Sequence, residues 1–192
     1  MPEQNTIAVW DPLIRLFHWS LVAAFLVAYL TEDDLMTLHV WAGYTVLGLI
    51  GFRLLWGIVG TRHARFTDFV RSPSVVLAYL RDIAAQRAKR HLGHNPAGGA
   101  MVIVLLVTLL LIGLTGLGVY AVEEHAGPLA GMLGGLGHDA EEFLEEAHEW
   151  LANLAVVLIV LHVAGVVLAG RQHGENLVRA MINGRKRAAE RR

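Results

Sequence analysis

Four long apolar runs, separated by polar segments, dominate the pattern of hydrophobic and polar positions along the chain. A helix of about 20 apolar residues crosses the hydrocarbon core of a bilayer. Each run meets or approaches that length, so each predicts one spanning helix. The pattern therefore predicts an all-α fold, an integral membrane four-helix bundle in which residues 1–192 form a single domain. The expected spans are residues 13–30, 35–59, 97–122 and 148–170.

Shorter signals mark the segments around these spans. Asp11-Pro12 is typical of a helix start, with Asp as the N-cap and Pro at the first helical position. Between Ser74 and Gln86 the apolar side chains recur at helical spacing, which predicts an amphipathic helix lying on the membrane surface. Residues 123–147 are acidic and rich in glycine, and we expect a loop there.

Lysine and arginine are segregated among the segments that flank the predicted spans. Residues 61–96 hold seven of them and residues 171–192 hold seven more, whereas residues 31–34 and 123–149 hold none. Cytoplasmic segments of membrane proteins carry an excess of Lys and Arg. We therefore expect both termini and the long basic segment in the cytoplasm. The basic runs are interpreted as topology signals and not as a nucleic-acid surface.

Composition supports a membrane protein and limits its chemistry. The chain is 55% apolar and 17% charged, with a mean hydropathy of +0.48, whereas soluble domains average about 25% charged residues. Membrane lipid is therefore an expected partner. The absence of cysteine excludes disulfides, thiolate metal sites and iron–sulfur clusters. Any bound metal must be held by histidine or carboxylate.

Histidines within the apolar spans are candidate functional residues, because ionisable groups in a bilayer are costly. His148 and His162 bracket the last run, fourteen residues apart. On an α-helix this spacing is close to four full turns and about 21 Å, so both imidazoles share one face. The alternative is that such a histidine only bonds a neighbouring helix.

The expected topology sorts four histidines by depth. His18 and His162 lie toward the cytoplasmic ends of their helices, and His39 and His148 lie toward the outer ends. Paired neutral imidazoles on facing helices can ligate a haem iron from both sides. Structural zinc normally takes four protein ligands, whereas each level offers two histidines. Haem fits better because its porphyrin supplies the other four nitrogens.

Small residues and two arginines could accommodate such a flat cofactor. Glycines in the second, third and fourth spans let a macrocycle, or simply another helix, approach closely. Arg53 follows His39 by fourteen residues and could pair with propionates of the inner haem. Arg15, one turn before His18, is a second candidate. Either arginine could instead extend its charged head to the membrane interface.

Several short motifs surround the candidate histidines. They are Leu16-Phe17-His18-Trp19, then His39, Trp41, Gly43 and Tyr44, then Arg53, Trp56, Gly57 and Gly60, and the histidine pair of the fourth span. Together these motifs resemble the bacterial cytochrome b561 family, which includes the b-type cytochrome subunit of nickel–iron hydrogenases. The resemblance covers residues 10–187 and implies a four-helix bundle with two bis-histidine b haems per chain and electron transfer with quinone. It implies that the ligands are His18, His39, His148 and His162.

We expect a dihaem b-type cytochrome of the bacterial inner membrane that moves electrons between a periplasmic partner and the quinone pool. The partner could be a cytochrome c or a hydrogenase-like protein, and the chain could form a homodimer. One alternative is an enzyme that oxidises superoxide at the outer face and reduces quinone, although acidic outer loops should repel superoxide. Another is a non-haem helical bundle, such as a metal transporter or scaffold.

Two further groups of side chains are less specific. His91 and His94 precede Asn95-Pro96 and could bind a proton or a quinone oxygen, although solvated loop residues are the simpler interpretation. The outer segments carry carboxylates without lysine or arginine, and could steer a basic electron carrier. A solvated face required by topology alone explains the same pattern.

Overall fold

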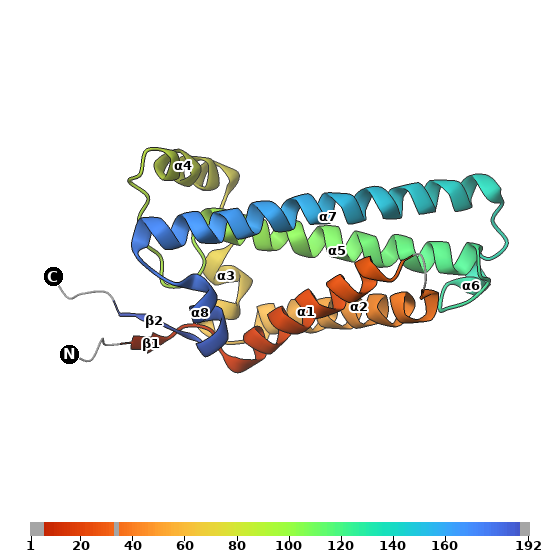
Figure 1. Cartoon of the computed structure of the whole chain (residues 1–192), viewed down its shortest axis with the longest axis horizontal. Helices are drawn as coiled ribbons and strands as arrows, with labels where there is room; N and C mark the ends of the chain where they lie inside the picture. Colours follow the sequence, from red (N-terminus) through yellow and green to blue (C-terminus); the bar gives the residue numbers. More distant parts are fainter. Residues whose placement is uncertain (1–5, 33–34, 189–192) are drawn as a thin grey trace. The chain divides into compact units, whose positions relative to one another are not determined.

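The computed structural model describes residues 6–32 and 35–188. Four long helices account for most of this part of the chain, and each is apolar and long enough to cross a membrane (Figure 1). The predicted all-α class with four membrane-spanning helices is therefore confirmed. These helices are α1 Pro12–Leu30, α2 Met36–Val59, α5 Pro96–Val122 and α7 His138–His173.

The basic segment between α2 and α5 is largely helical. It holds a short 3-10 helix, Arg62–Ala64, followed by α3, Phe66–Phe69, and α4, Pro73–Ala84. The last of these confirms the helix predicted between Ser74 and Gln86.

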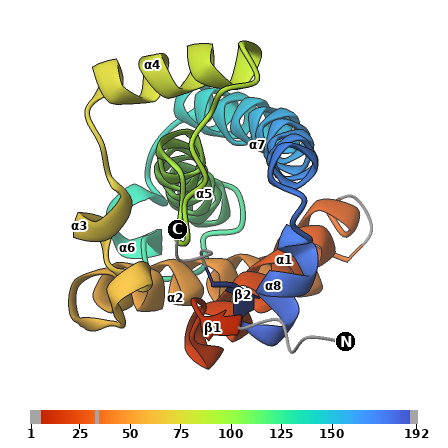
Figure 2. The same ribbon diagram turned by 90° about the vertical axis from the view of Figure 1, so that its left-hand side faces the viewer.

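The remaining elements lie near the ends of α7 and of the chain. Helix α6, Ala130–Leu133, precedes α7, and α8, Leu177–Asn183, follows it. Strands β1, Thr6–Ala8, and β2, Arg185–Arg187, pair antiparallel and lie beside α8 (Figure 2). The first and last described segments of the chain are thereby joined.

Contacts among residues divide the chain into two compact units. Organisation as a single domain accordingly stays a prediction. All sixteen lysines and arginines belong to unit 1, and unit 2 has none. Unit 1 comprises Met1–Trp19, Phe52–Ile103 and Val160–Arg192, and unit 2 comprises Ser20–Gly51 and Val104–Ile159.

Helix α7 begins ten residues before the predicted span, because residues expected in a loop are helical. The glycines of the segment end at Gly137, directly before the helix. The next ten residues are rich in Glu, Ala and Leu, which are strong helix formers. Asp139 and Glu141 in the first turn also favour a helix N-terminus. The predicted loop over residues 123–147 is therefore wrong from His138 onward, and the short helix α6 interrupts it as well.

The start of α1 is fixed by Asp11, as predicted. Its Oδ1 accepts hydrogen bonds from the backbone N–H groups of Leu13 and Ile14, both at 3.0 Å, which caps the helix. Its Oδ2 accepts from the indole N–H of Trp56 and the hydroxyl of Thr61. Burial alone would raise the pKa of the Asp11 carboxyl, but these hydrogen bonds outweigh burial and lower it. One carboxylate thus joins α1 to the end of α2.

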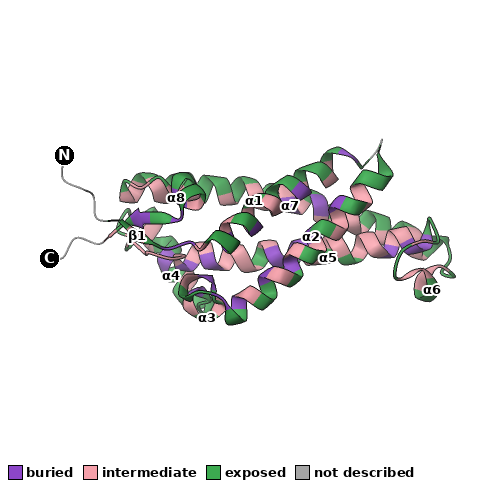
Figure 3. Ribbon diagram, turned by 90° about the horizontal axis from the view of Figure 1, so that it is seen from below, coloured by how far each residue is buried: buried purple, intermediate pink, exposed green. Residues whose placement is uncertain are grey.

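Large apolar side chains remain exposed along the spanning helices, and the ribbon of Figure 3 shows exposed positions along these helices in green. Trp41 is 66% exposed and Ile58 is 71% exposed. Exposed apolar area of this extent marks a surface that another apolar phase covers. On helices long enough to span a bilayer, that phase is lipid.

Candidate functional site

His39 and His148 come together in unit 2. Their ring centroids lie 6.0 Å apart, and the ring planes are inclined by 70°. His39 is on α2 and His148 is on α7. A metal atom that takes one nitrogen from each ring at about 2 Å needs centroids roughly 6 Å apart. The separation therefore suits one metal atom held between the two rings.

Each of these imidazoles is held through Nδ1 by a main-chain carbonyl. His39 Nδ1 lies 2.9 Å from the carbonyl oxygen of Ala28, and His148 Nδ1 lies 3.0 Å from that of Ile112. A carbonyl oxygen only accepts, so we assign the proton to Nδ1. Nε2 then carries a free lone pair, which is the arrangement that metal-binding histidines adopt.

Two adjacent residues of α5 shape the His148 side of this pair. A Cβ added to Gly116 would lie 2.8 Å from Cε1 of His148, so glycine lets the ring rest against the helix. The Thr115 hydroxyl donates to the Leu111 carbonyl at 2.9 Å, and its oxygen lies 3.2 Å from His148 Nδ1. Thr115 therefore provides a second acceptor for the Nδ1 proton.

Other glycines of unit 2 separate into two kinds. A Cβ added to Gly113 would overlap the side chain of Leu47, so this glycine serves helix packing. Gly43 follows His39 by one turn, on the same face of α2, and has no neighbour within 4 Å of such a Cβ. Open space flanks His39 on this face, as a broad planar cofactor requires.

His18 and His162 both belong to unit 1, so each predicted pair is contained in one unit. The His18 ring meets Trp19 edge-on with centroids 5.0 Å apart, and its Nδ1 is buried without a hydrogen-bond partner. His162 is half-buried on α7. Among the described residues these two rings make no ring–ring contact like that of His39 and His148. Their role as ligands stays a prediction.

Arg53 is buried in unit 1, with 3% of its surface exposed. Its guanidinium carbon lies 4.7 Å from the centroid of the Phe66 ring and 5.7 Å from that of Phe69, which are cation–π distances. One terminal nitrogen, Nη1, has no hydrogen-bond partner. Aromatic rings of α3 thus cover the guanidinium, and its predicted role beside a propionate stays a prediction.

Arg15 has a different environment. Its Nη1 donates to the carbonyl oxygen of Ile182 near the end of α8, where a cation suits the helix C-terminus. Trp19 donates to the neighbouring carbonyl of Met181 at 3.4 Å. The structure thus gives Arg15 a part in docking α8 against α1, and its predicted role beside a propionate stays a prediction.

His94 is the polar residue that sequence reasoning undervalued. The solvated interpretation is wrong, because the ring packs between Trp10 and Phe69, with each centroid 4.6 Å from its own. Its Nδ1 is buried and has no hydrogen-bond partner. The one sequence signal was its place directly before Asn95, whose Oδ1 accepts from the N–H of Gly98 at 2.7 Å and so starts α5.

The other loop histidines have partners of their own. His91 Nδ1 lies 2.9 Å from the carbonyl oxygen of Lys89, and His63 Nδ1 lies 2.9 Å from Oδ2 of Asp68. Both rings are therefore held by local contacts, and neither presents an unpaired buried nitrogen.

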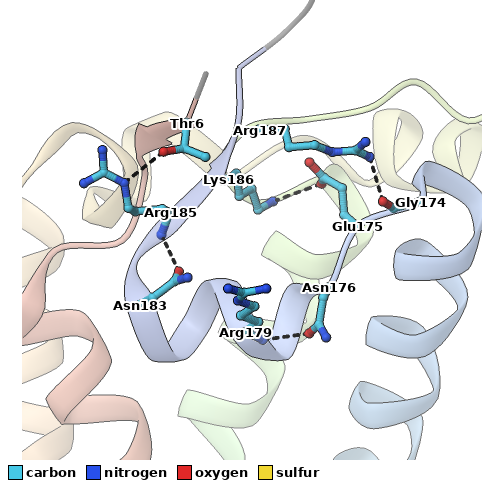
Figure 4. Close-up of a pocket in the computed structure, with 9 residues that line it drawn as sticks. All are labelled: Thr6, Gly174, Glu175, Asn176, Arg179, Asn183, Arg185, Lys186 and Arg187. Atoms are coloured by element: carbon cyan, nitrogen blue, oxygen red, sulfur yellow. Dashed lines mark hydrogen bonds and ion pairs between the residues drawn. The ribbon is translucent and has the colours of Figure 1, made fainter. Parts of the chain in front are cut away.

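A polar pocket of about 530 Å³ lies at the end of the chain in unit 1 (Figure 4). Glu175 and Lys186 face each other in it at 3.9 Å, and Arg187 donates to the carbonyl of Gly174 at 2.6 Å. These contacts hold β2 against the segment between α7 and α8. The pocket contains none of the four predicted ligands.

A bare metal ion has no adequate site among residues 6–32 and 35–188. No group of three or more His, Asp or Glu side chains converges in this part of the chain. A haem iron has different needs, because the porphyrin provides four nitrogens and the protein supplies only axial ligands. The pair formed by His39 and His148 fits that requirement.

Comparison with known proteins agrees with this chemistry. The family model of prokaryotic cytochrome b561 matches residues 9–184, which is nearly the whole chain. No curated protein and no solved structure matches this chain. The match, the four spanning helices and the close pair of His39 and His148 lead to one conclusion: the chain belongs to the prokaryotic cytochrome b561 family, whose members are haem-binding b-type membrane cytochromes of electron transfer.

Proposed function

We propose that this cytochrome holds two b haems per chain and carries electrons across the bacterial inner membrane, between a periplasmic redox partner and the quinone pool. His39 and His148 would ligate one haem, and His18 and His162 the other. The proposal rests above all on the geometry of His39 and His148, which combines a centroid separation of 6.0 Å with Nδ1 contacts to main-chain carbonyls.

The residues of the chain have distinct tasks in this proposal. The carbonyls of Ala28 and Ile112 orient the rings of His39 and His148 and keep the proton on Nδ1. Arg53 supplies a buried positive charge in the unit that holds the second pair. Bound haem supplies the one-electron chemistry of iron, while the protein supplies ligation, orientation and a low-dielectric setting.

The charge of the two units supports an orientation. Unit 1 carries all sixteen lysines and arginines and both chain ends, whereas unit 2 carries no basic Lys or Arg residue. The positive-inside rule accordingly favours a cytoplasmic position for the loops of unit 1. In this orientation His18 and His162 serve the cytoplasmic side, and His39 and His148 the periplasmic side.

The acidic charge of unit 2 disfavours the superoxide alternative. Superoxide is an anion, and a negative surface lowers its local concentration instead of raising it. Burial and the neighbouring carboxylates Glu124, Glu145 and Glu141 all raise the pKa of Glu123, which shows how densely negative charge gathers there. A basic protein partner suits this surface better.

Haem stoichiometry tests the proposal. Protein purified in detergent should show a low-spin b-type spectrum and yield two haems per chain as the pyridine complex. Acid acetone should extract both, because the chain has no cysteine for covalent attachment. Addition of a quinol should reduce both haems. A single extractable haem, or a spectrum that no quinol changes, would refute the dihaem quinone-linked function and leave the family assignment intact.

A further inference from the structure

Among the described residues of unit 1, four buried polar atoms outside the proposed ligands lack a partner: Nε of Arg15, Nη1 of Arg53, Nδ1 of His94 and Nε2 of His173. Nearly all buried polar atoms in proteins are hydrogen-bonded, because an unpaired one loses its hydration without compensation. Two of the four, those of Arg53 and His94, belong to side chains that pack against the same ring, Phe69. Arg53 is also only 3% exposed, so this pair indicates a site for something other than protein.

Phe69 brings the two groups into one neighbourhood. Its ring centroid lies 5.7 Å from the guanidinium carbon of Arg53 and 4.6 Å from the ring centroid of His94. Burial first, and the positive charge of Arg53 next, hold the pKa of His94 well below its ordinary value. His94 is therefore neutral at pH 7 and offers one N–H donor, while Arg53 offers donors only.

Glycines build this neighbourhood by close approach. A Cβ added to Gly57 on α2 would overlap the ring of Phe66, which covers Arg53. A Cβ added to Gly99 on α5 would lie 2.7 Å from the carbonyl oxygen of Phe69. Both phenylalanines can therefore lie directly against the spanning helices and enclose the Arg53 side chain.

The carboxylates around this site are already engaged with other partners. Asp68 lies 3.6 Å from Nε of Arg62, and Glu175 lies 3.9 Å from Lys186. Asp11 is the carboxylate whose charge acts on Arg53, but its Oδ2 already accepts from Trp56 and Thr61. Among the described residues, no ion pair within 4 Å joins Arg53 to an acidic side chain. A buried cation without an anion is strongly unfavourable, so the chemistry of the site calls for an anionic acceptor.

We propose that Arg53 and His94 together form a two-donor site for a carboxylate, and that this carboxylate is a propionate of the haem held by His18 and His162. The inference rests on the proposed dihaem function. Carboxylate oxygens only accept hydrogen bonds, so one group can satisfy both the guanidinium and the neutral imidazole. His94 is the new member of the site, a loop residue that fixes the cofactor from outside the spanning helices.

Esterified haem separates this role from a purely structural one. The protein is stripped of cofactor and reloaded with haem b or with its dimethyl ester, which has the same ring without charged propionates. The rate of haem loss to an excess of a haem-scavenging protein is then measured. Hydrogen bonds to charged groups correspond to about 10- to 100-fold in affinity, so Arg53→Gln should accelerate loss of haem b by about that factor. Loss of the ester should hardly change.

Matched variants assign the effect to each donor. His94→Leu should accelerate the loss of haem b and not of the ester, whereas His94→Asn keeps an N–H near Nδ1 and should restore retention. Arg53→Lys keeps the charge and should retain part of the effect. Arg87→Gln and His91→Leu are controls, because the Arg87 side chain is 72% exposed and pairs with Asp82, and His91 has its own partner in Lys89.

The outcomes are distinct. Haem b and its dimethyl ester are compared within one variant. A general destabilisation of the protein would accelerate the loss of both forms, and that result would overturn the carboxylate site. Equal retention of both forms in Arg53→Gln and His94→Leu would overturn it too. The haem bound by His39 and His148 serves as an internal reference for folding. If His162→Ala removes no haem, the proposed function has failed, which is a separate result.

Discussion

Units 1 and 2 differ in charge to an extent that the near-neutral net charge of the chain conceals. Unit 1 carries all sixteen lysines and arginines, whereas unit 2 carries none and holds eleven of the seventeen acidic residues. The net charge of −1 is thus the sum of a basic unit and an acidic one. Each unit contains one predicted histidine pair, so similar ligands stand in opposite electrostatic settings.

The two pairs also differ in how their rings are held. In unit 2 the Nδ1 atoms of His39 and His148 contact main-chain carbonyls. In unit 1 the Nδ1 of His18 has no hydrogen-bond partner, and the unpaired cation Arg53 is buried in the same unit. We therefore expect haem binding in unit 2 to depend mainly on how the rings are oriented, and haem binding in unit 1 to depend mainly on charge. Substitutions in the two units should differ in the same way.

Removal of one ligand from each unit should have the largest effect. His148→Ala and His162→Ala should each reduce the haem content from two to one per chain, because each variant would remove one of the two histidines that would hold a haem. Haem is quantified as the pyridine complex against protein mass. His138→Ala is the control, because its side chain is 82% exposed at the start of α7.

The same two variants also test whether each unit holds one haem with its own midpoint potential. A nearby cation favours the reduced iron, so we expect the haem of unit 1 to have the higher midpoint potential. A redox titration of His162→Ala should therefore lack the higher potential, and that of His148→Ala the lower one. If His18→Ala removed the same haem as His148→Ala, the assignment of one pair to each unit would be wrong.

Substitution of Gly116 should disturb ring orientation in unit 2 alone. A Cβ at this position would lie 2.8 Å from His148 Cε1, so Gly116→Ala must displace the ring from its contact with Ile112. Loss of such supporting contacts typically costs about 10- to 100-fold in metal affinity. The rate of haem loss measures the effect. Gly118→Ala is the matched control, since its Cβ would meet only the flexible end of Leu144, at 3.1 Å.

Asp11 should affect the stability of unit 1 to a smaller degree. Asp11→Ala removes an N-cap, which costs about 0.5–2 kcal/mol, and leaves Trp56 and Thr61 without their acceptor. Thermal unfolding followed by tryptophan fluorescence should show the loss at pH 7. Asp82→Ala, which removes a carboxylate bonded to the exposed Arg87, should have little effect.

The pH dependence of the Asp11 contribution has a definite sign. The folded pKa lies below the ordinary 3.8, so the stabilisation is fully present above 3.8 and is lost as pH falls through the folded value. Asp11→Asn retains a capping oxygen but cannot titrate. The difference between wild type and Asp11→Asn should therefore shrink in strong acid, and a difference that grows there would contradict the assignment.

Carboxylates at the start of α7 should have the smallest effect, on the encounter with a partner. Glu141, Glu142, Glu145 and Glu146 lie on neighbouring positions of the helix, since residues four apart share a face. Glu32 also belongs to the expected acidic surface, while Asp33 and Asp34 lie outside the described residues. Steering by such a surface weakens as the Debye length falls from about 10 Å at 0.1 M salt to about 3 Å at 1 M.

The fourfold Glu→Gln variant of these α7 residues should slow electron exchange between a basic carrier protein and the haem of unit 2. Stopped-flow rates at low and high salt measure the effect, and quinol-dependent reduction serves as the control that should not change. Rates indifferent to both salt and substitution would leave the carboxylates with a role in topology and solubility only.

The spanning helices and the α1 cap were predictable because hydropathy, helical spacing and capping are local properties of the sequence. The start of α7 at His138 was harder to predict, because glycines that favour a loop stand directly before the Glu and Ala residues that favour a helix. The intrinsic helix propensity of residues 138–147 favours a helix.

Contacts between distant segments were beyond sequence reasoning. Arg15 binds a carbonyl 167 residues away in the sequence, and His94 packs between Trp10 and Phe69. Neither contact leaves a periodic trace, because each depends on how helices and loops meet in three dimensions. The histidine spacing predicted candidate ligands, but the carbonyls that orient His39 and His148 required the structure.

Because β1 pairs with β2, the first strand to be synthesised must wait for the last. Arg185 bonds Thr6 across 179 residues of sequence, and contacts of such separation form late because the intervening loop must close first. During synthesis on the ribosome, all segments of unit 2 have been made once residue 159 is added, whereas unit 1 still lacks β2. Unit 1 should therefore mature only once β2 has left the ribosome, and a cofactor ligated by His162 would be enclosed last.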